Sequence, residues 1–359
     1  MISPWPFMLA LLVPLSAAAG IALGGPWVAA CPVLVFVLVP LAEIPLGISR
    51  TNPDASAEKA LASRRAFGAV TWASAPLLTA LVLWALLSVA WHPRSLMETV
   101  FLAFAVGIAT GAVGITAAHE LVHRQGSVER FLGHWILVLV LYDHWAVEHV
   151  HGHHRWVATP GDPASARKGE GAWTFVVRSA VGGFADACAI EANRLERRGL
   201  VRTGPANRVL RGLAAEALLL MLVAWLLGLR ALLFFLGQAL VAVILLELVN
   251  YVEHYGLRRA PRPGGGWERV EPRHSWNASH RLTNWLLLHL QRHSDHHAHA
   301  SRRYQILRHA EEAPQLPAGY ATMILAAMVP PLWRRIMDPR LESWMGSAAA
   351  PRALAGAEA

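Results

Sequence analysis

The sequence predicts an all-α integral membrane protein with six transmembrane helices. Of its 359 residues, 55% are hydrophobic and 16% are charged, whereas soluble domains carry roughly 25% charged residues. Mean hydropathy is +0.37. Six apolar runs approach the length of about 20 residues that a helix needs to cross a bilayer. The net charge of +8 lies mostly between these runs, so membrane topology explains it and no binding of nucleic acid is expected.

Two of the links between the runs are very short. The runs cover residues 6–24, 27–47, 72–91, 98–118, 209–228 and 231–252. Residues 24–26 separate the first two runs and residues 228–230 separate the last two, which predicts tight helical hairpins. We expect residues 1–345 to form a single membrane-embedded domain. Residues 346–359 are rich in Ala and Gly, and we expect them to be a disordered tail.

Basic residues indicate which side of the membrane each link faces. The stretches 48–71 and 187–208 contain several Lys and Arg residues, whereas the short links near residues 25, 94 and 229 contain few. Positively charged links stay in the cytoplasm. The pattern therefore predicts that the basic links and both termini face the cytoplasm.

Eighteen histidines are the feature that a membrane composition does not explain. Nine of them lie in four stretches on the predicted cytoplasmic side: His119, His123, His149, His153, His154, His254, His293, His296 and His297. Eight recur at helical spacing in three of the stretches, and His254 adds a single candidate ligand from another helix. Side chains at i and i+4 share one helix face, so His119 and His123 should point together, as should His149 and His153. A first-row metal ion takes at most about six ligands, and a catalytic ion leaves one position open. Nine imidazoles therefore predict two metal ions.

Spacing alone leaves the identity of these metals open, because imidazole binds iron, copper, zinc and nickel alike. Polar neighbours of the nine histidines are candidates to orient the ring N–H groups or to balance the metal charge. They are Glu120, Glu148, Glu253, Asp295 and His144. His151 breaks the i, i+4 pattern and is not expected to be a ligand.

Other functions fit parts of this pattern. Residues 119–123 match the H-E-x-x-H motif of zinc metalloproteases, but such an enzyme has no use for three further histidine stretches. A metal transporter would hold its ligands near the middle of the bilayer, whereas these stretches lie at helix ends. Glu247 is an ionisable residue inside the sixth run, and it either lines a substrate cavity or pairs with a neighbouring helix.

Longer segments around the histidines resemble the membrane-bound alkane 1-monooxygenases, within the fatty acid desaturase and hydroxylase superfamily. The resemblance covers most of the chain and lies in NYVEHYGL (250–257), LQRHSDHH (290–297), VATPGDPASAR (157–167), HSWN (274–277) and APQLPAGY (313–320). The first two segments are similar to signatures that separate alkane hydroxylases from desaturases.

This resemblance implies a bacterial inner-membrane enzyme with a cytoplasmic di-iron centre held by the nine histidines. It implies that the enzyme uses O₂ to hydroxylate the terminal methyl group of medium- to long-chain n-alkanes to 1-alkanols. Electrons would come from rubredoxin and rubredoxin reductase. In the family, a bulky residue of the second span limits the depth of the substrate tunnel. That place falls here on Val35 or Phe36, and Glu247 is a further candidate for the tunnel lining.

Two departures from the family pattern concern the substrate. Residues 122–124 read Val-His-Arg, and residues 47–53 lack the acidic turn that the alkane enzymes carry after the second span. These departures leave open the alternative that the enzyme hydroxylates aromatic methyl groups, as a xylene monooxygenase does. A fatty-acyl desaturase or hydroxylase on the same scaffold is the other alternative.

Overall fold

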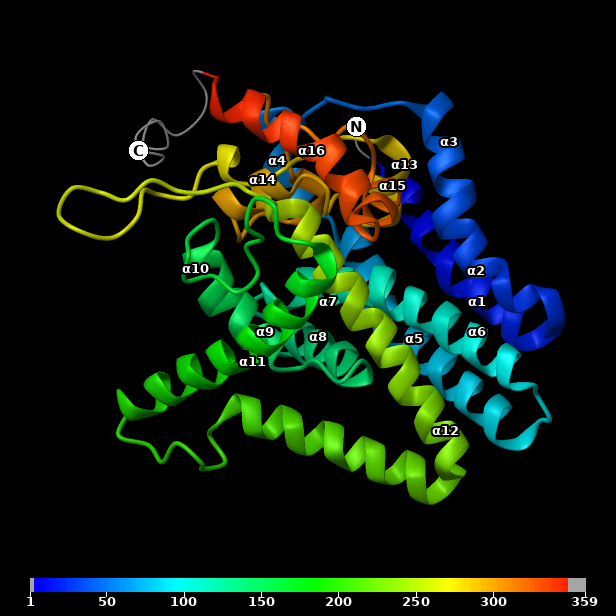
Figure 1. Cartoon of the computed structure of the whole chain (residues 1–359). Coiled ribbons are helices and arrows are strands. Elements are labelled where there is room, and N and C mark those ends of the chain that lie inside the picture. Colours follow the sequence, from blue (N-terminus) through cyan, green and yellow to red (C-terminus); the bar gives the residue numbers. More distant parts are fainter. Residues whose placement is uncertain (1–2, 348–359) are drawn as a thin grey trace.

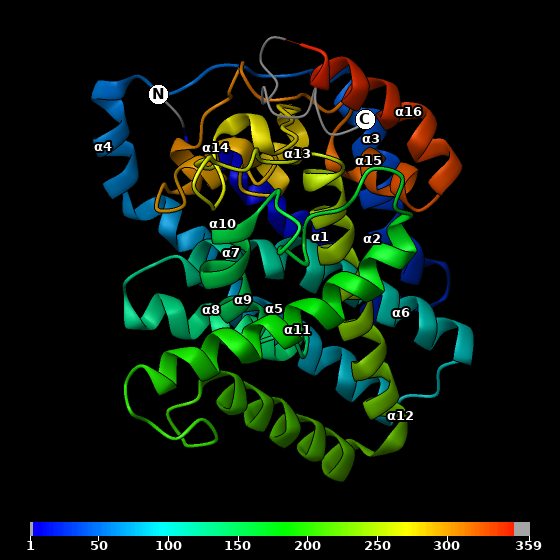
Figure 2. The same ribbon diagram turned by 60° about the vertical axis from the view of Figure 1, so that its left-hand side comes forward.

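The computed structural model describes residues 3–347 and shows a helical protein. Among these residues, extended pairing occurs only as isolated bridges, so the predicted all-α class is confirmed. Long helices form a bundle, and the short helices of the C-terminal part gather over one end of it (Figure 1 and Figure 2). The predicted disordered tail lies outside the described residues from residue 348 onward.

The first two predicted runs form a helical hairpin. Its elements are η1 (Trp5–Leu11), α1 (Leu12–Leu23), η2 (Gly25–Ala29), α2 (Ala30–Val33), η3 (Leu34–Leu38) and α3 (Val39–Leu46). Gly24 and Gly25 turn the chain with φ of 63° and 50°, a backbone conformation that glycine adopts without steric strain. The turn therefore brings α1 and α2 into contact.

The next two spans lead to the first histidine stretch. The elements are α4 (Ala55–Ser63), α5 (Arg65–Trp91), α6 (Leu96–Ile108), η4 (Ala109–Ile115) and α7 (Thr116–Val122). Ser95 and Glu98 begin α6 with a capping box, in which each side chain accepts a hydrogen bond from the other residue's amide. From α6 the helix continues without a break through η4 and α7, so it carries the chain directly to His119.

A group of shorter helices and one long helix follow. They are α8 (Ser127–Leu139), α9 (Trp145–Glu148), η5 (His149–His153), α10 (His154–Trp156) and α11 (Ala172–Glu196). Like η3 and η4, η5 is a π-helix. Such turns are rare and occur frequently at functional sites.

The longest helix, α12 (Arg208–His254), has two arms that meet at Gly228, where φ is 79° and ψ is 179°. The sharp bend is visible in Figure 1. The arms correspond to the predicted runs 209–228 and 231–252. The second arm packs tightly against α6 through Gly107, where an added Cβ atom would lie 2.6 Å from the carbonyl oxygen of Gln238.

Among the described residues, five helices are long and apolar enough to cross a membrane. They are Trp5–Leu23, Gly25–Leu46, Arg65–Trp91, Leu96–Val122 and Arg208–His254. These five contain all six predicted runs, because the last one includes both arms of α12. The transmembrane character is therefore confirmed, while the number of six spans and the cytoplasmic side of the histidines stay predictions.

The C-terminal part covers the end of the bundle that carries the histidines. It consists of η6 (Pro272–His274), α13 (Arg281–Leu286), α14 (His293–Ala298), η7 (Tyr304–Ile306), α15 (Tyr320–Ala327) and α16 (Pro330–Met345). The buried guanidinium of Arg292 donates hydrogen bonds to the carbonyl oxygens of Leu307, Ser49 and Thr51. It thereby ties this part to the segment that follows α3.

Candidate metal centre

The structure brings all nine predicted histidines together in two groups. The first group contains five residues, His119, His123, His149, His154 and His296, and the second contains four, His153, His254, His293 and His297. Within each group, one ring nitrogen per residue lies within 4.8 Å of the others. The groups are neighbours, since the rings of His154 and His297 are 4.6 Å apart between centroids. The role of these residues as ligands stays a proposal.

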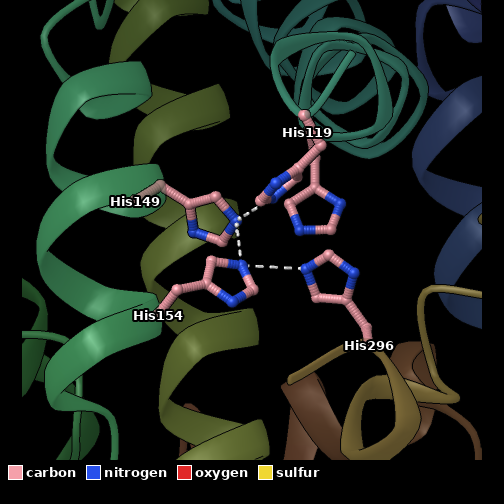
Figure 3. Close-up of side chains that lie close together, drawn as sticks. His119, His149, His154 and His296 are labelled. Atoms are coloured by element: carbon pink, nitrogen blue, oxygen red, sulfur yellow. Dashed lines mark hydrogen bonds between the residues drawn. The ribbon is translucent and has the colours of Figure 1, made fainter. Parts of the chain in front are cut away.

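The first group gathers rings from α7, η5, α10 and α14 around a common point. Figure 3 shows the rings of His119, His149, His154 and His296 turned toward one another. The Nε2 atom of His154 lies 3.1 Å from Nε2 of His149 and 3.0 Å from Nε2 of His296. The Nε2 atom of His123 lies 3.1 Å from that of His149.

The second group repeats this arrangement with rings from η5, α12 and α14. The Nε2 atoms of His153 and His297 are 3.2 Å apart, as are those of His254 and His293. A neutral imidazole nitrogen either donates or accepts one hydrogen bond. In the first group, three contacts link four Nε2 atoms, so neutral rings can turn at most two of these contacts into hydrogen bonds. The Nε2 of His119 is also buried without a hydrogen-bond partner.

A metal ion at the centre of each group fits these contacts. Two nitrogens bound at about 2.1 Å from one ion and roughly 90–100° apart would themselves be about 3.0–3.2 Å apart. Burial in the folded chain also lowers the pKa of His149, His154 and His297 well below the ordinary value. The rings are thus neutral at pH 7, which is the form that binds metals.

The grouping corrects one expectation from the sequence. His149 and His153 were expected to point together as an i, i+4 pair, but they belong to different groups. The reason is the π-helical turn η5, in which the backbone bonds run from i to i+5. The wider turn places His149 beside His154, five residues later. In α14, likewise, His296 joins the first group while His293 joins the second.

Two carboxylates touch histidines of the second group. The Oδ2 atom of Asp162 accepts a 2.9 Å hydrogen bond from Nδ1 of His153. Glu253, one of the predicted neighbours, lies 3.2 Å from Nε2 of His293 and accepts a hydrogen bond from the hydroxyl of Tyr320. Sequence spacing did not indicate Asp162, which lies nine residues beyond His153. Its only signal was its place in the 157–167 segment.

Within residues 3–347, the other predicted neighbours form no hydrogen bond or ion pair with the histidine rings of the two groups. Glu120 pairs with Arg124, and Asp295 pairs with Arg302 at 2.5 Å. Glu148 is buried, and its Oε1 has no hydrogen-bond partner among the described residues. The ring of His144 packs edge-on against Tyr142 and Phe184 instead of a histidine of either group.

An apolar cavity leads from the bundle interior to the histidines. Its volume is about 890 Å³, counting all the space between its lining atoms and the open space at its mouth. His119 and His149 of the first group and His293 of the second line one end of it. Val35 and Phe36, the two residues expected to limit the substrate tunnel, line it as well.

Glu247 does not line this cavity, which corrects its assignment to the tunnel. The hydroxyl of Tyr142 donates a 2.8 Å hydrogen bond to its Oε1, and the side chain of Asn250 donates one to its Oε2. Glu247 lines a separate, smaller pocket next to His144. Of the two alternatives drawn from the sequence, the structure therefore shows pairing with neighbouring side chains.

Comparison with known proteins identifies the family of this chain. Residues 95–327 match the model of the fatty acid desaturase family. Alkane 1-monooxygenase 2 of Pseudomonas aeruginosa is 41% identical over 313 residues, which are 87% of this chain and 83% of that protein. The chain belongs to the alkane 1-monooxygenase family. The family resemblance drawn from the sequence segments is thereby confirmed.

Other relatives show how far this membership extends. A second alkane 1-monooxygenase, from Alcanivorax borkumensis, is 38% identical over 347 residues, 95% of this chain and 90% of its own length. The hydroxylase component of a xylene/toluene monooxygenase from Pseudomonas putida is 29% identical over 237 residues, 66% of this chain and 62% of its own length. As an alkane 1-monooxygenase family member, the chain is an enzyme, as predicted.

Proposed function

We propose that this chain is a di-iron monooxygenase that hydroxylates the terminal methyl group of medium- to long-chain n-alkanes to 1-alkanols. The observation that carries this proposal is the apolar cavity that both histidine groups line at one end. A terminal methyl group held at that end would lie beside both metal positions. The names of the relatives support alkane as the substrate.

The metals supply the oxidation chemistry. Iron held by neutral imidazoles, given O₂ and two electrons, provides an oxidant strong enough for an unactivated C–H bond, which no side chain can attack. The chain supplies position and dryness. The indole of Trp145 stacks on His149 with ring centroids 4.3 Å apart and walls the cavity next to the metal position. Its apolar neighbours exclude water from the reacting methyl group.

The electrons are proposed to come from rubredoxin and rubredoxin reductase on the cytoplasmic side. The segment after α14 carries Arg302, Arg303 and Arg308, which would face an acidic donor protein. Asp295 and Glu58 form ion pairs with Arg302 and Arg308, so part of this charge is compensated within the chain. Arg303 forms no ion pair with Asp295 or Glu58, so we expect it to contribute most to the attraction of an acidic donor.

A second candidate substrate is an aromatic methyl group. The similarity to the xylene/toluene monooxygenase component favours it, and a cavity with so few polar groups would also admit a benzene ring. The long shape of an n-alkane fits better a cavity whose lining runs from Val13 and Ile108 to the histidines. We expect octane or hexadecane to be preferred over xylene. A fatty acid would place its carboxylate against apolar side chains, which costs desolvation.

The test is hydroxylation in membranes supplied with rubredoxin, its reductase and NADH. Octane, hexadecane, xylene and a fatty acid are compared, and iron per chain is counted. We expect 1-alkanol and about two irons. His296→Ala should lower activity more than about 100-fold and reduce the iron content. His151→Ala is the matched control, because His151 is exposed, lies in the same helical stretch and belongs to neither group.

Either of two results would overturn the proposal. Full activity in His296→Ala would show that the histidine groups do not carry the reaction. Xylene turnover well above that of both alkanes would assign the chain to aromatic methyl groups.

A further inference from the structure

A long apolar groove lies on the outside of the bundle, between α6 and the second arm of α12. It encloses about 1490 Å³, counting the open space above it. It is at the opposite end of the bundle from the histidines, because Thr99 in its lining precedes His119 by twenty residues, or about 30 Å of helix. It is therefore separate from the catalytic cavity.

The shape of the groove follows from the sizes of its side chains. Its floor consists of the small residues Ala103 and Gly237, and a Cβ atom on Gly237 would meet only Ala103, at 3.5 Å. Larger side chains rise on both sides, with Val100 and Phe104 on α6 and Leu233 and Leu240 on α12. Leu233 and Leu240 are 59% and 60% exposed, so these walls face outward.

The length of the groove matches half a bilayer. Its lining on α12 runs from Arg230 to Val241, twelve residues whose eleven helical steps span about 16 Å. The hydrocarbon core of a bilayer is about 30 Å thick, so one leaflet contributes about 15 Å. One acyl chain lying along the groove would therefore extend from the membrane surface to the middle of the bilayer.

Two arginines stand at the outer end of the groove. The guanidinium of Arg94 donates hydrogen bonds to the hydroxyl of Ser88 and the carbonyl oxygen of Ile21. The guanidinium of Arg230 donates to the hydroxyl of Thr99 and to the backbone of Arg94. Among the described residues, no carboxylate forms a hydrogen bond to either guanidinium.

The one acidic group nearby does not cancel this charge. Glu98 attracts Arg94 electrostatically, but its oxygens accept hydrogen bonds from the backbone amides of Gly25 and Ser95. Two positive charges thus stand beside one negative charge at the outer end of the groove. Arginine binds phosphate through two parallel N–H donors, and guanidinium groups held by neighbouring hydrogen bonds are already oriented for it.

We propose that this groove binds an anionic phospholipid, with one acyl chain between α6 and α12 and the phosphate against Arg94 and Arg230. The chemistry selects this occupant. An alkane offers no negative charge to the two guanidinium groups, and a free phosphate ion would leave the apolar groove empty. The bound lipid would also brace α6 against α12, close to where Ile108 and Leu245 line the catalytic cavity.

The test is lipid binding by the full chain in detergent, measured by native mass spectrometry and by thermal unfolding. Phosphatidylglycerol, phosphatidylcholine with the same acyl chains, inorganic phosphate and octane are the four probes. Phosphatidylglycerol should bind and raise the unfolding temperature more than the other three. Arg230→Gln should weaken its binding roughly tenfold, the loss expected when one charge-assisted hydrogen bond to the phosphate is removed.

Two glycine variants test the groove itself. Gly237→Leu fills its floor while both arginines remain, and Gly237→Ala leaves it open because the new Cβ meets only Ala103 at van der Waals distance. Lipid binding should be lost in the first variant and kept in the second. Arg211→Gln, an exposed arginine on the other arm of α12, is the control for charge.

Four results would overturn the proposal. The first is an equal response to phosphatidylglycerol and phosphatidylcholine. The second is a phosphate response as large as that to phosphatidylglycerol, which would mean a simple anion site. The third is wild-type lipid binding in both Arg230→Gln and Gly237→Leu, which would mean that the arginines contact lipid headgroups without forming a specific site with the groove. The fourth is a change of oligomeric mass in Gly237→Leu without a change in bound lipid, which would assign the groove to a second copy of the chain.

Discussion

A histidine that binds a metal must present one particular ring nitrogen, and Asp162 makes that choice for His153. The carboxylate accepts the hydrogen bond from Nδ1–H, which leaves the lone pair on Nε2 for the metal. Asp162 is held in turn by the Ser165 hydroxyl and the backbone amide of Ala164. Burial raises the pKa of Asp162, but His153 and these donors outweigh it, so the pKa lies below the ordinary value.

Replacing Asp162 by Ala should therefore damage the second metal position more than the first. We expect activity and iron affinity to fall about 10- to 100-fold, the usual effect of losing such a partner. Iron content and a Mössbauer spectrum of the remaining iron would measure it. Glu196→Ala, which removes an exposed carboxylate at the end of α11, is the control. Normal occupancy of both positions in Asp162→Ala would contradict this role.

Two side chains of the second span are placed to set the accepted alkane length. Val35 and Phe36 line the cavity, whereas their neighbour Val37 is 47% exposed and does not. Val35→Trp and Phe36→Trp should shift product from hexadecanol toward shorter alcohols, because the larger indole shortens the cavity. Val37→Trp should leave the product distribution unchanged. Chain-length profiles by gas chromatography would decide, and three identical profiles would remove both residues from the tunnel.

At the scale of elements, the three π-helices explain what the sequence could and could not predict. Regular spacing selected eight of the nine histidines, because three of the four stretches repeat a histidine every three to five residues. His254 stands alone in its stretch and was selected by its place at the end of the sixth run. Spacing was not enough to assign the histidines to the two groups, because the sequence of residues 149–153 does not indicate a π-helical turn. Pairing of His149 with His154 depends on that turn. Sequence spacing missed Asp162 for a related reason, because a loop and not a helix brings Asp162 back to His153.

A second element-scale feature is the clamp between α11 and α12. Glu191 is fully buried and accepts hydrogen bonds from both Arg194 and Arg208, including the backbone amide of Arg208 at the start of α12. Burial raises the pKa of Glu191, but these bonds outweigh it and lower the pKa to about 2. A carboxyl with a lowered pKa stabilises the fold above its unfolded pKa and loses that contribution as the pH falls.

Glu191→Gln should therefore destabilise the protein by about 2 kcal/mol at pH 7, the range for hydrogen bonds to a charged group. The difference from wild type should be constant down to about pH 4.5 and shrink as the pH approaches 2. Unfolding in detergent at pH 7 and pH 3 would measure it. Glu196 lies on the same helix as Glu191, and Glu196→Gln removes only its exposed ion pair with Arg202. This variant should change the free energy of unfolding little. An equal difference in the free energy of unfolding between wild type and variant at both pH values would exclude a stabilising role for ionised Glu191.

At the scale of the whole molecule, the two ends of the bundle have different tasks. One end holds the histidines under α13–α16 and opens into an apolar interior. The other end carries Arg94 and Arg230. Hydropathy and the basic links predicted that the histidines gather at one face of the membrane, and which face it is stays a prediction. They did not predict that the segment after α14 would fold back and neutralise part of its own basic charge, because Glu58 and Arg308 are 250 residues apart in the chain.

The net charge of +8 gives the last prediction. If an acidic rubredoxin approaches the segment that carries Arg302, Arg303 and Arg308, long-range attraction raises the rate of encounter, and salt screens this attraction over about 10 Å at 0.1 M. kcat/KM for rubredoxin should fall roughly tenfold between low and high ionic strength. kcat at saturating rubredoxin and KM for octane should change little, because neither depends on the rate of encounter.

Arg303→Gln should reduce the salt dependence, since Arg303 is the arginine of this segment that forms no ion pair with Asp295 or Glu58. A rate that is independent of salt would show that docking relies on apolar contacts instead.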